Sequence, residues 1–194
     1  MLVGVLALQG AFREHQKALK ACGVDTVQVR KPEHLDGLSG LVIPGGESTT
    51  MSKLLVEYHL LEPIIQLGRD GMPIFGTCAG LIMLAKEING SDQARLGLMD
   101  IKVERNAFGR QVQSFEAHLV ISQLGEEPFR GIFIRAPYIM EVGAGVEIWA
   151  QYEEKIVCVK QDNLLGAAFH PELTDDLRFH RQFIDIISNE PKCI

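Results

Sequence analysis

The segment Pro73-Ile74-Phe75-Gly76-Thr77-Cys78-Ala79-Gly80-Leu81 decides the fold. A short apolar run ends in Gly-x-Cys-x-Gly, and apolar residues at helical spacing follow directly. This order predicts a nucleophile elbow, a sharp strand-to-helix turn, with cysteine in the position that serine takes in hydrolases. Gly76 and Gly80 leave room for a turn whose apex residue has a strained backbone. Cys78 is then a nucleophile at a helix N-terminus, where the helix dipole favours the thiolate; the alternative is an ordinary buried cysteine.

The composition is that of a folded α/β protein. The 194 residues are 46% hydrophobic and 23% charged, which fits a single domain over residues 1–194. The net charge of -6 argues against non-specific binding to nucleic acid. The cysteines form no C-x-x-C pair, so we expect no metal site, no disulfide framework and a reducing, cytoplasmic location. The apolar run at 1–8 predicts a first strand and not a signal peptide, and no segment approaches the length of a membrane span.

Strand and helix patterns alternate through the first half of the chain. The predicted strands are the apolar runs at 2–8, 25–30 and 41–43 and the strand of the elbow. The predicted helices lie at 12–22, from 48 or 49 to 56, and at 61–67. This alternation is typical of a mostly parallel sheet with helices on both faces.

The second half of the chain is mostly strand-like. A final apolar strand is predicted at 164–169, ending at His170-Pro171-Glu172, and the strand patterns before it lie at 101–103, 111–122, 132–134, 147–151 and 156–160. Glu153-Glu154 is a predicted hairpin turn, and 89–97 a loop. We expect these strands to form an antiparallel extension of the same sheet, followed by a helix from about Thr174 to Ser188.

The segment His170-Pro171-Glu172 supplies a base and a group to orient it, as a thiolate nucleophile requires. Pro171 favours an extended His170, and residues two apart in an extended chain project to the same side. Because this segment and Cys78 both follow predicted strands, we expect them at the same carboxyl edge of the sheet. The alternative is a surface His-Pro corner beside an incidental acid.

The third motif is Pro44-Gly45-Gly46-Glu47-Ser48, at the end of a predicted strand. Glycines there can turn N–H groups outward, so the Gly46 and Ala79 N–H groups are the candidate oxyanion hole. A phosphate cradle is the alternative, although the chain has neither G-x-G-x-x-G nor a Gly-Lys-Ser/Thr ending. Arg105 and Arg135 each follow a predicted strand, where a cation could hold a substrate carboxylate.

The remaining histidines and cysteines carry weaker signals. His15, His34 and His59 are expected on helix or loop surface, and His118 and His180 in solvated or hydrogen-bonded structural roles. No glycine-flanked turn surrounds the other cysteines, which are expected to be inert: Cys22, Cys158 and Cys193.

Taken together, the motifs resemble those of class I, triad-type glutamine amidotransferases. The likeness is greatest to the glutaminase subunits of pyridoxal 5′-phosphate synthase and covers nearly the whole chain. It is carried by Leu8-Gln9-Gly10-Ala11-Phe12-x-Glu14-His15, Pro44-Gly45-Gly46-Glu47-Ser48-Thr49-Thr50, Gly76-Thr77-Cys78-Ala79-Gly80-Leu81, Arg105-Asn106-Ala107-Phe108-Gly109-Arg110-Gln111 and Phe169-His170-Pro171-Glu172-Leu173-Thr174. Gln113, where the family has an acidic residue, is a peripheral departure.

The resemblance implies a three-layer, flavodoxin-like class I glutaminase fold and hydrolysis of L-glutamine without a cofactor or metal. It implies a triad of Cys78, His170 and Glu172 with a γ-glutamyl thioester intermediate. The residues that it places around the glutamine are Gly46, Glu47, Ser48, Arg105, Ile134 and Arg135.

The resemblance also implies a partner, a (β/α)8-barrel synthase subunit that receives the ammonia and forms a ring-shaped core decorated by glutaminase subunits. Gln9 and Gly10 are the candidate partner-facing residues. We hypothesise that the Gly45–Gly46 peptide turns its N–H into the oxyanion hole only when the partner docks beside them, because glycine makes such a flip inexpensive.

Two other functions are compatible with the residues alone. One is a different triad hydrolase, such as a cysteine peptidase or an amidotransferase that serves another synthase. The other is a flavodoxin-like binding module in which the Gly-Gly loop holds a phosphate and Cys78 is structural.

Overall fold

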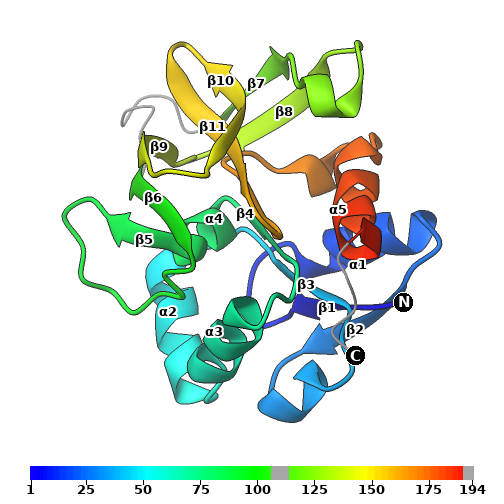
Figure 1. The fold of residues 1–194 in the computed structure, drawn as a ribbon, viewed down its shortest axis with the longest axis vertical. Coiled ribbons are helices and arrows are strands. Elements are labelled where there is room, and N and C mark those ends of the chain that lie inside the picture. Colours follow the sequence, from blue (N-terminus) through cyan, green and yellow to red (C-terminus); the bar gives the residue numbers. More distant parts are fainter. Residues whose placement is uncertain (106–113, 190–194) are drawn as a thin grey trace.

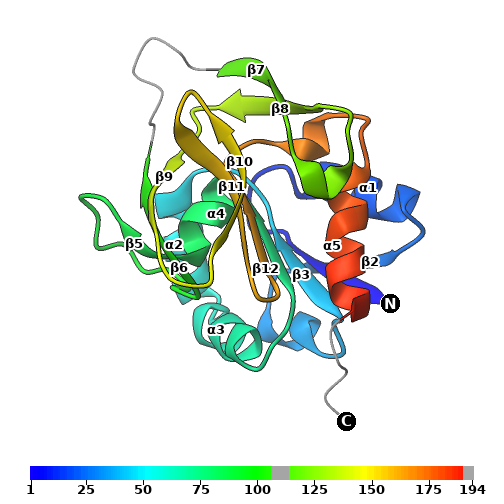
Figure 2. The same ribbon diagram turned by 45° about the horizontal axis from the view of Figure 1, so that its top comes forward.

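The computed structural model describes residues 1–105 and 114–189. A central ten-stranded sheet has the order β2-β1-β3-β4-β12-β11-β9-β6-β5, with β10 paired to β11. Helices α1 and α5 cover one face, and α2, α3 and α4 cover the other (Figures 1 and 2). The predicted three-layer α/β fold is confirmed. The helices are α1 (Phe12–Ala21), α2 (Ser48–Glu57), α3 (Leu61–Arg69), α4 (Ala79–Leu84) and α5 (Arg178–Asn189).

Five strands form the parallel half of the sheet, and each of their neighbouring pairs is parallel. They are β1 (Leu2–Leu6), β2 (Asp25–Val29), β3 (Gly40–Ile43), β4 (Ile74–Thr77) and β12 (Leu164–Ala167). The last three are buried along their whole length, as expected for strands covered on both faces. Since β3, β4 and β12 are adjacent, the loops that follow them meet at one carboxyl edge.

The antiparallel extension is confirmed for part of the second half. Its strands are β6 (Met99–Glu104), β9 (Tyr138–Val142), β10 (Glu147–Tyr152) and β11 (Lys155–Gln161), and at the edge β5 (Ala85–Ile88) pairs with β6 in parallel. The turn between β10 and β11 is the predicted Glu153-Glu154 hairpin, and both residues have the positive φ that a tight two-residue turn requires. The sequence analysis missed β5 and β9; β5 has only four residues, and its middle two are exposed.

One part of the predicted extension is wrong, because β7 (Ser114–Leu119) and β8 (Phe129–Ile134) form a separate two-stranded sheet. Phe129 and Phe133 on β8 pack against Phe169, with ring centroids 5.8 and 5.5 Å apart. These contacts hold the hairpin against the core at the carboxyl edge of β12. The predicted strand at 111–122 begins, in the described residues, at Ser114.

The last helix also differs from its prediction. Residues Pro171–Leu173 form a 3-10 turn, and α5 begins at Arg178 and not near Thr174. The carboxylate of Asp176 accepts a hydrogen bond from the Arg178 N–H at 3.0 Å and so caps the helix. Two further 3-10 turns are Pro32–Leu35 and Ser122–Leu124. Among the described residues, no helix is long and apolar enough to cross a membrane.

Gly80 offers a test of how tightly the elbow is packed. A Cβ added to it would lie 2.0 Å from the carbonyl oxygen of Ile43 on β3. Alanine normally stabilises a helix relative to glycine by about 1 kcal/mol. We predict the opposite for Gly80→Ala, a loss of about 2 kcal/mol in the free energy of unfolding, because main chain must move. Equilibrium urea unfolding measures this difference.

The matched control is Gly68→Ala in α3. A Cβ there would meet side-chain ends, Leu98 Cδ1 at 2.4 Å and Ile74 Cδ1 at 3.2 Å, which can move at small cost. We expect Gly68→Ala to lose much less stability than Gly80→Ala. A Gly80→Ala protein as stable as the wild type would contradict the packing described here.

Candidate active site

Cys78 lies at the apex of the turn between β4 and α4. Its φ of 49° and ψ of -102° are unusual for a residue with a Cβ, as the predicted elbow requires. The Cys78 N–H donates to the Ala167 carbonyl oxygen on β12 at 2.8 Å, which fixes the turn to the neighbouring strand. A Cβ on Gly76 would lie 2.6 Å from the Gly80 backbone, so both glycines are required by close approach.

His170 follows β12 and lies at the same edge of the sheet as Cys78. Its Nδ1 is 2.7 Å from Oε1 of Glu172, and both residues are buried. Its N–H donates to the Ile132 carbonyl oxygen at 2.8 Å, which joins the segment to β8. The contact arises differently from the prediction, because Pro171–Leu173 is a 3-10 turn and not extended chain. The turn brings the Glu172 carboxylate back to the imidazole.

The electrostatics of the three groups favour a charged imidazole. Burial alone would lower the pKa of His170, but hydrogen bonds with Cys78 and Glu172 outweigh it and raise this pKa to about 10. Burial likewise acts to raise the pKa of Glu172, but contacts with His15 and His170 bring it below its ordinary value. A proton on the imidazole between a thiol and a carboxylate is the arrangement that activates a cysteine nucleophile.

A cavity of about 250 Å³ opens beside Cys78 and His170. It brings together all six residues predicted to surround a substrate, together with Ile82, which the sequence analysis did not single out. The lining residues are Gly46, Glu47, Ser48, Cys78, Ile82, Arg105, Ile134, Arg135 and His170. Two arginines and the elbow cysteine therefore line the same cavity. Of the predicted family segment 105–111, only Arg105 belongs to the described residues, and Gln113 lies outside them.

The loop before α2 is held by Gln9. Its side-chain amide donates to the Glu47 carbonyl oxygen at 2.8 Å and accepts from the Glu47 N–H at 3.1 Å. Gly10 approaches the same loop so closely that a Cβ would lie 1.7 Å from the Gly45 carbonyl oxygen. Gln9 and Gly10 thus contact the loop that carries the candidate oxyanion donor Gly46.

The Glu47 side chain serves a structural purpose. Its carboxylate accepts hydrogen bonds from the N–H and hydroxyl groups of Thr49 and Thr50, at the start of α2. Although burial acts in the other direction, these bonds lower the pKa of Glu47 to about 2. Since the carboxylate caps the helix, Glu47 presents main chain to the cavity.

The prediction of a surface position for His15 is wrong, because the residue is fully buried beside Glu172. Its Nε2 lies 3.3 Å from Oε2 of Glu172 and 3.1 Å from Oγ1 of Thr77, and its Nδ1 lies 3.0 Å from Nε2 of His180. The helical spacing could have predicted this burial, because residue 15 lies on the same helix face as the buried Ala18 and Leu19.

The other weak candidates stand mostly as predicted. His59 and His118 are exposed, and His34 is partly buried. Burial raises the pKa of both the Cys22 and the Cys158 thiol, which agrees with unreactive side chains. Cys193 lies outside the described residues.

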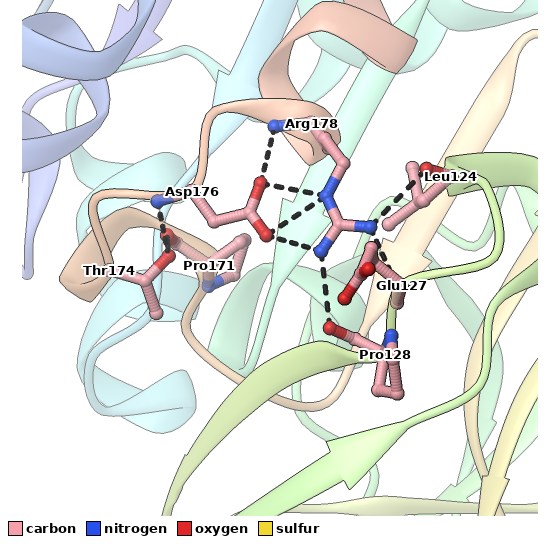
Figure 3. A network of polar contacts seen from close by, with 7 residues as sticks. All are labelled: Leu124, Glu127, Pro128, Pro171, Thr174, Asp176 and Arg178. Atoms are coloured by element: carbon pink, nitrogen blue, oxygen red, sulfur yellow. Dashed lines mark hydrogen bonds and ion pairs between the residues drawn. The ribbon is translucent and has the colours of Figure 1, made fainter.

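Arg178 fixes the segment that follows the triad (Figure 3). Its guanidinium pairs with the Asp176 carboxylate and donates to the main-chain oxygens of Leu124, Glu127 and Pro128, the last two at 2.7 and 3.2 Å. The Thr174 hydroxyl donates to the Pro171 carbonyl oxygen at 3.0 Å. The chain from His170 to α5 is therefore anchored to the β7–β8 hairpin at both ends.

Comparison with known proteins agrees with this geometry. Residues 5–189 match the model of the SNO glutamine amidotransferase family. The chain belongs to this family. A relative from Pelotomaculum thermopropionicum, named pyridoxal 5′-phosphate synthase subunit PdxT, is 69% identical over 95% of this chain and 94% of the relative. Another of the same name, from Bacillus velezensis, is 55% identical over 95% of this chain and 93% of its own length.

A solved structure confirms the glutamine amidotransferase fold. The crystal structure of a glutamine amidotransferase is 51% identical in sequence and has a TM-score of 0.91 over 96% of this chain and 98% of its own. The predicted resemblance to this enzyme family, read from five motifs, is therefore confirmed.

Because His15 and His180 are buried, we predict that the free energy of unfolding falls in acid. Burial, together with the repulsion that a protonated His15 would exert, lowers the pKa of His180 to about 3, against the opposing effect of Glu172. The unfolded chain binds a proton at about pH 6.5, so the free energy of unfolding falls as the pH drops from there toward 3. We expect His180→Phe to lose less stability than the wild type between pH 7 and 5, above the range where Glu172 titrates. Urea unfolding at the two pH values checks this, and equal losses would contradict it.

Proposed function

We propose that this glutamine amidotransferase hydrolyses L-glutamine to L-glutamate and ammonia through a triad of Cys78, His170 and Glu172. The observation that carries the proposal is the position of Cys78, at positive φ on a helix N-terminus, beside an imidazole that Glu172 holds at 2.7 Å. A thiolate needs such a base to deliver and recover protons.

The reaction begins when the Cys78 thiolate attacks the side-chain amide carbon of glutamine and forms a tetrahedral oxyanion. His170, held by Glu172, protonates the amide nitrogen, and ammonia leaves as the γ-glutamyl thioester forms. Water then attacks the thioester carbon while His170 takes one of its protons. Release of glutamate restores the thiolate–imidazolium pair.

Two main-chain N–H groups are the proposed oxyanion hole. Ala79 is the first residue of α4, so its N–H has no partner within the helix. In the Gly45–Gly46 peptide group, the Gly45 carbonyl oxygen lies against Gly10. Because the peptide is trans, the Gly46 N–H points in the opposite direction, away from Gly10. Both donors belong to loops at the carboxyl edge of the sheet, where negative charge develops.

Glutamine is recognised by the cavity beside the triad. Arg105 or Arg135 pairs with the α-carboxylate, a match that a planar guanidinium makes well. The main chain of Gly46, Glu47 and Ser48 and the side chain of Ile134 complete the site.

We further propose that the ammonia passes to a separate synthase subunit that makes pyridoxal 5′-phosphate. The names of the relatives support a synthase as the partner. Ammonia released into water near neutral pH becomes mostly ammonium, which is not a nucleophile, so direct transfer preserves its reactivity. We propose that the partner is a (β/α)8-barrel subunit that forms a ring-shaped core. The proposed location is the cytoplasm, whose reducing conditions keep Cys78 a free thiol.

The test of the proposed chemistry is glutamine hydrolysis by wild type and Cys78→Ala, each with the synthase subunit. We expect ammonia release to fall to background in Cys78→Ala, because no other described cysteine lies in the cavity. Cys22→Ala is the matched control and should retain activity. A Cys78→Ala protein that still released ammonia would favour a binding module, and cleavage of other amides in preference to glutamine would favour a different hydrolase.

A second test concerns the loop that Gln9 holds. A flip of the Gly45–Gly46 peptide would carry the Gly45 carbonyl oxygen past Gly10. A partner that docks beside Gln9 and Gly10 can therefore change the direction of the Gly46 N–H, one of the two proposed oxyanion donors. We expect the synthase subunit to raise the glutaminase rate, and Gln9→Ala to lose about tenfold of that stimulation because two hydrogen bonds to Glu47 disappear. Equal rates with and without the partner would exclude this coupling.

A further inference from the structure

A row of buried polar side chains continues the triad into the interior. Oε1 of Glu172 faces His170, whereas Oε2 faces His15, whose Nε2 is 3.3 Å away. Oε2 is fully buried and accepts no hydrogen bond within the described part of the chain, so the His15 ring is its polar neighbour. His15 in turn meets His180 at 3.0 Å, and both rings are completely shielded from solvent. Burial of so many polar groups costs free energy unless they interact with one another.

The proton positions in this row follow from its geometry. A neutral imidazole has one donor and one acceptor nitrogen. His15 Nε2 lies 3.1 Å from its hydrogen-bond partner, Oγ1 of Thr77, and 3.3 Å from a carboxylate oxygen, so it carries the proton and its Nδ1 is the acceptor. His180 Nε2 must then donate to that Nδ1, which leaves His180 Nδ1 as a bare acceptor. That atom is the one buried nitrogen without a partner among the described side chains, so no N–H is left unpaired.

We propose that His15 and His180 are positioning residues for glutamine hydrolysis: the Nε2–H of His15 lies against the second oxygen of Glu172, and His180 fixes the tautomer that places the proton there. The inference rests on the proposed function. With one oxygen against His170 and the other against His15, the carboxylate is held in place beside the imidazole. The N–H dipole beside Oε2 also stabilises the carboxylate, which stabilises the imidazolium and hence the Cys78 thiolate.

The charges around the two rings agree with neutral histidines. Burial, with the positive charge of His170 acting in the same direction, lowers the pKa of His15 against the opposing effects of Glu172 and Glu14. Burial is also the main cause that lowers the pKa of His180 to about 3. Neither ring is protonated near neutral pH, so the row acts through its N–H groups and not through a second positive charge.

The test compares His15→Leu, which removes the donor, with His15→Gln, whose amide N–H can replace Nε2–H. One readout is kcat and KM for glutamine with the synthase subunit present. We expect His15→Leu to lower kcat by about tenfold with KM nearly unchanged, and His15→Gln to restore most of the loss. The second readout is the pH dependence of Cys78 alkylation by iodoacetamide, followed on the Cys78 peptide by mass spectrometry. Its midpoint should rise by roughly one pH unit in His15→Leu and return in His15→Gln.

Asn163→Leu is the matched control, because it removes a buried hydrogen bond, Asn163 Nδ2 to the Met72 carbonyl oxygen at 2.7 Å, at the opposite end of β12. We expect it to lower stability and leave the alkylation midpoint unchanged. If His15→Leu does not fold, His180→Phe replaces it, and its midpoint should rise in the same direction.

Three results would overturn the inference: a wild-type kcat and midpoint in His15→Leu, a loss in His15→Gln as large as in His15→Leu, or an unchanged midpoint in His180→Phe. The alkylation readout needs no glutamine. A shifted midpoint in a protein whose wild type does not hydrolyse glutamine would therefore refute the proposed function and preserve the role of His15.

Discussion

The close approach of main chain to main chain around the elbow is the constraint on which the rest of the site depends. Gly80 on α4 lies against the Ile43 carbonyl oxygen at the end of β3, and Gly76 lies against Gly80. With no side chain at either position, α4 can start directly above the sheet and Cys78 can occupy a positive φ at its N-terminus. A larger residue at either glycine would move the helix and, with it, the sulfur.

The parallel register converts this local turn into a shared site. Ala167 on β12 pairs with Thr77 on β4, so the residues that follow the two strands emerge side by side, although they are about ninety positions apart in the chain. β3 lies on the other side of β4 and brings the Gly45–Gly46 loop to the same edge. Three loops from three adjacent strands therefore carry the proposed nucleophile, base and N–H donor without any long excursion of the chain.

The sequence predicted what depends on local chemistry. The elbow and the parallel half follow from glycine positions, apolar runs and the rule that parallel strands share a carboxyl edge, whereas the full set of residues around the cavity came from the family resemblance. What it missed depends on packing between distant segments. The β7–β8 hairpin leaves the main sheet because Phe129 and Phe133 pack on Phe169, and a strand pattern contains no information about that choice. The start of α5 depends on Asp176 and on Arg178, whose guanidinium binds main-chain oxygens about fifty residues away (Figure 3).

His15 is another case in which the sequence shows the position of a residue but not its contacts with distant segments. Its place on the apolar face of α1 was readable, but its partners come from β4, the turn after β12 and α5. These contacts tie the first and last helices of the described chain to one carboxylate. Because Glu172 is buried, its negative charge is tolerated only while groups from all these elements hold it in place. The charge beside His170 thus depends on contacts from all of these elements, and the elbow alone does not supply them.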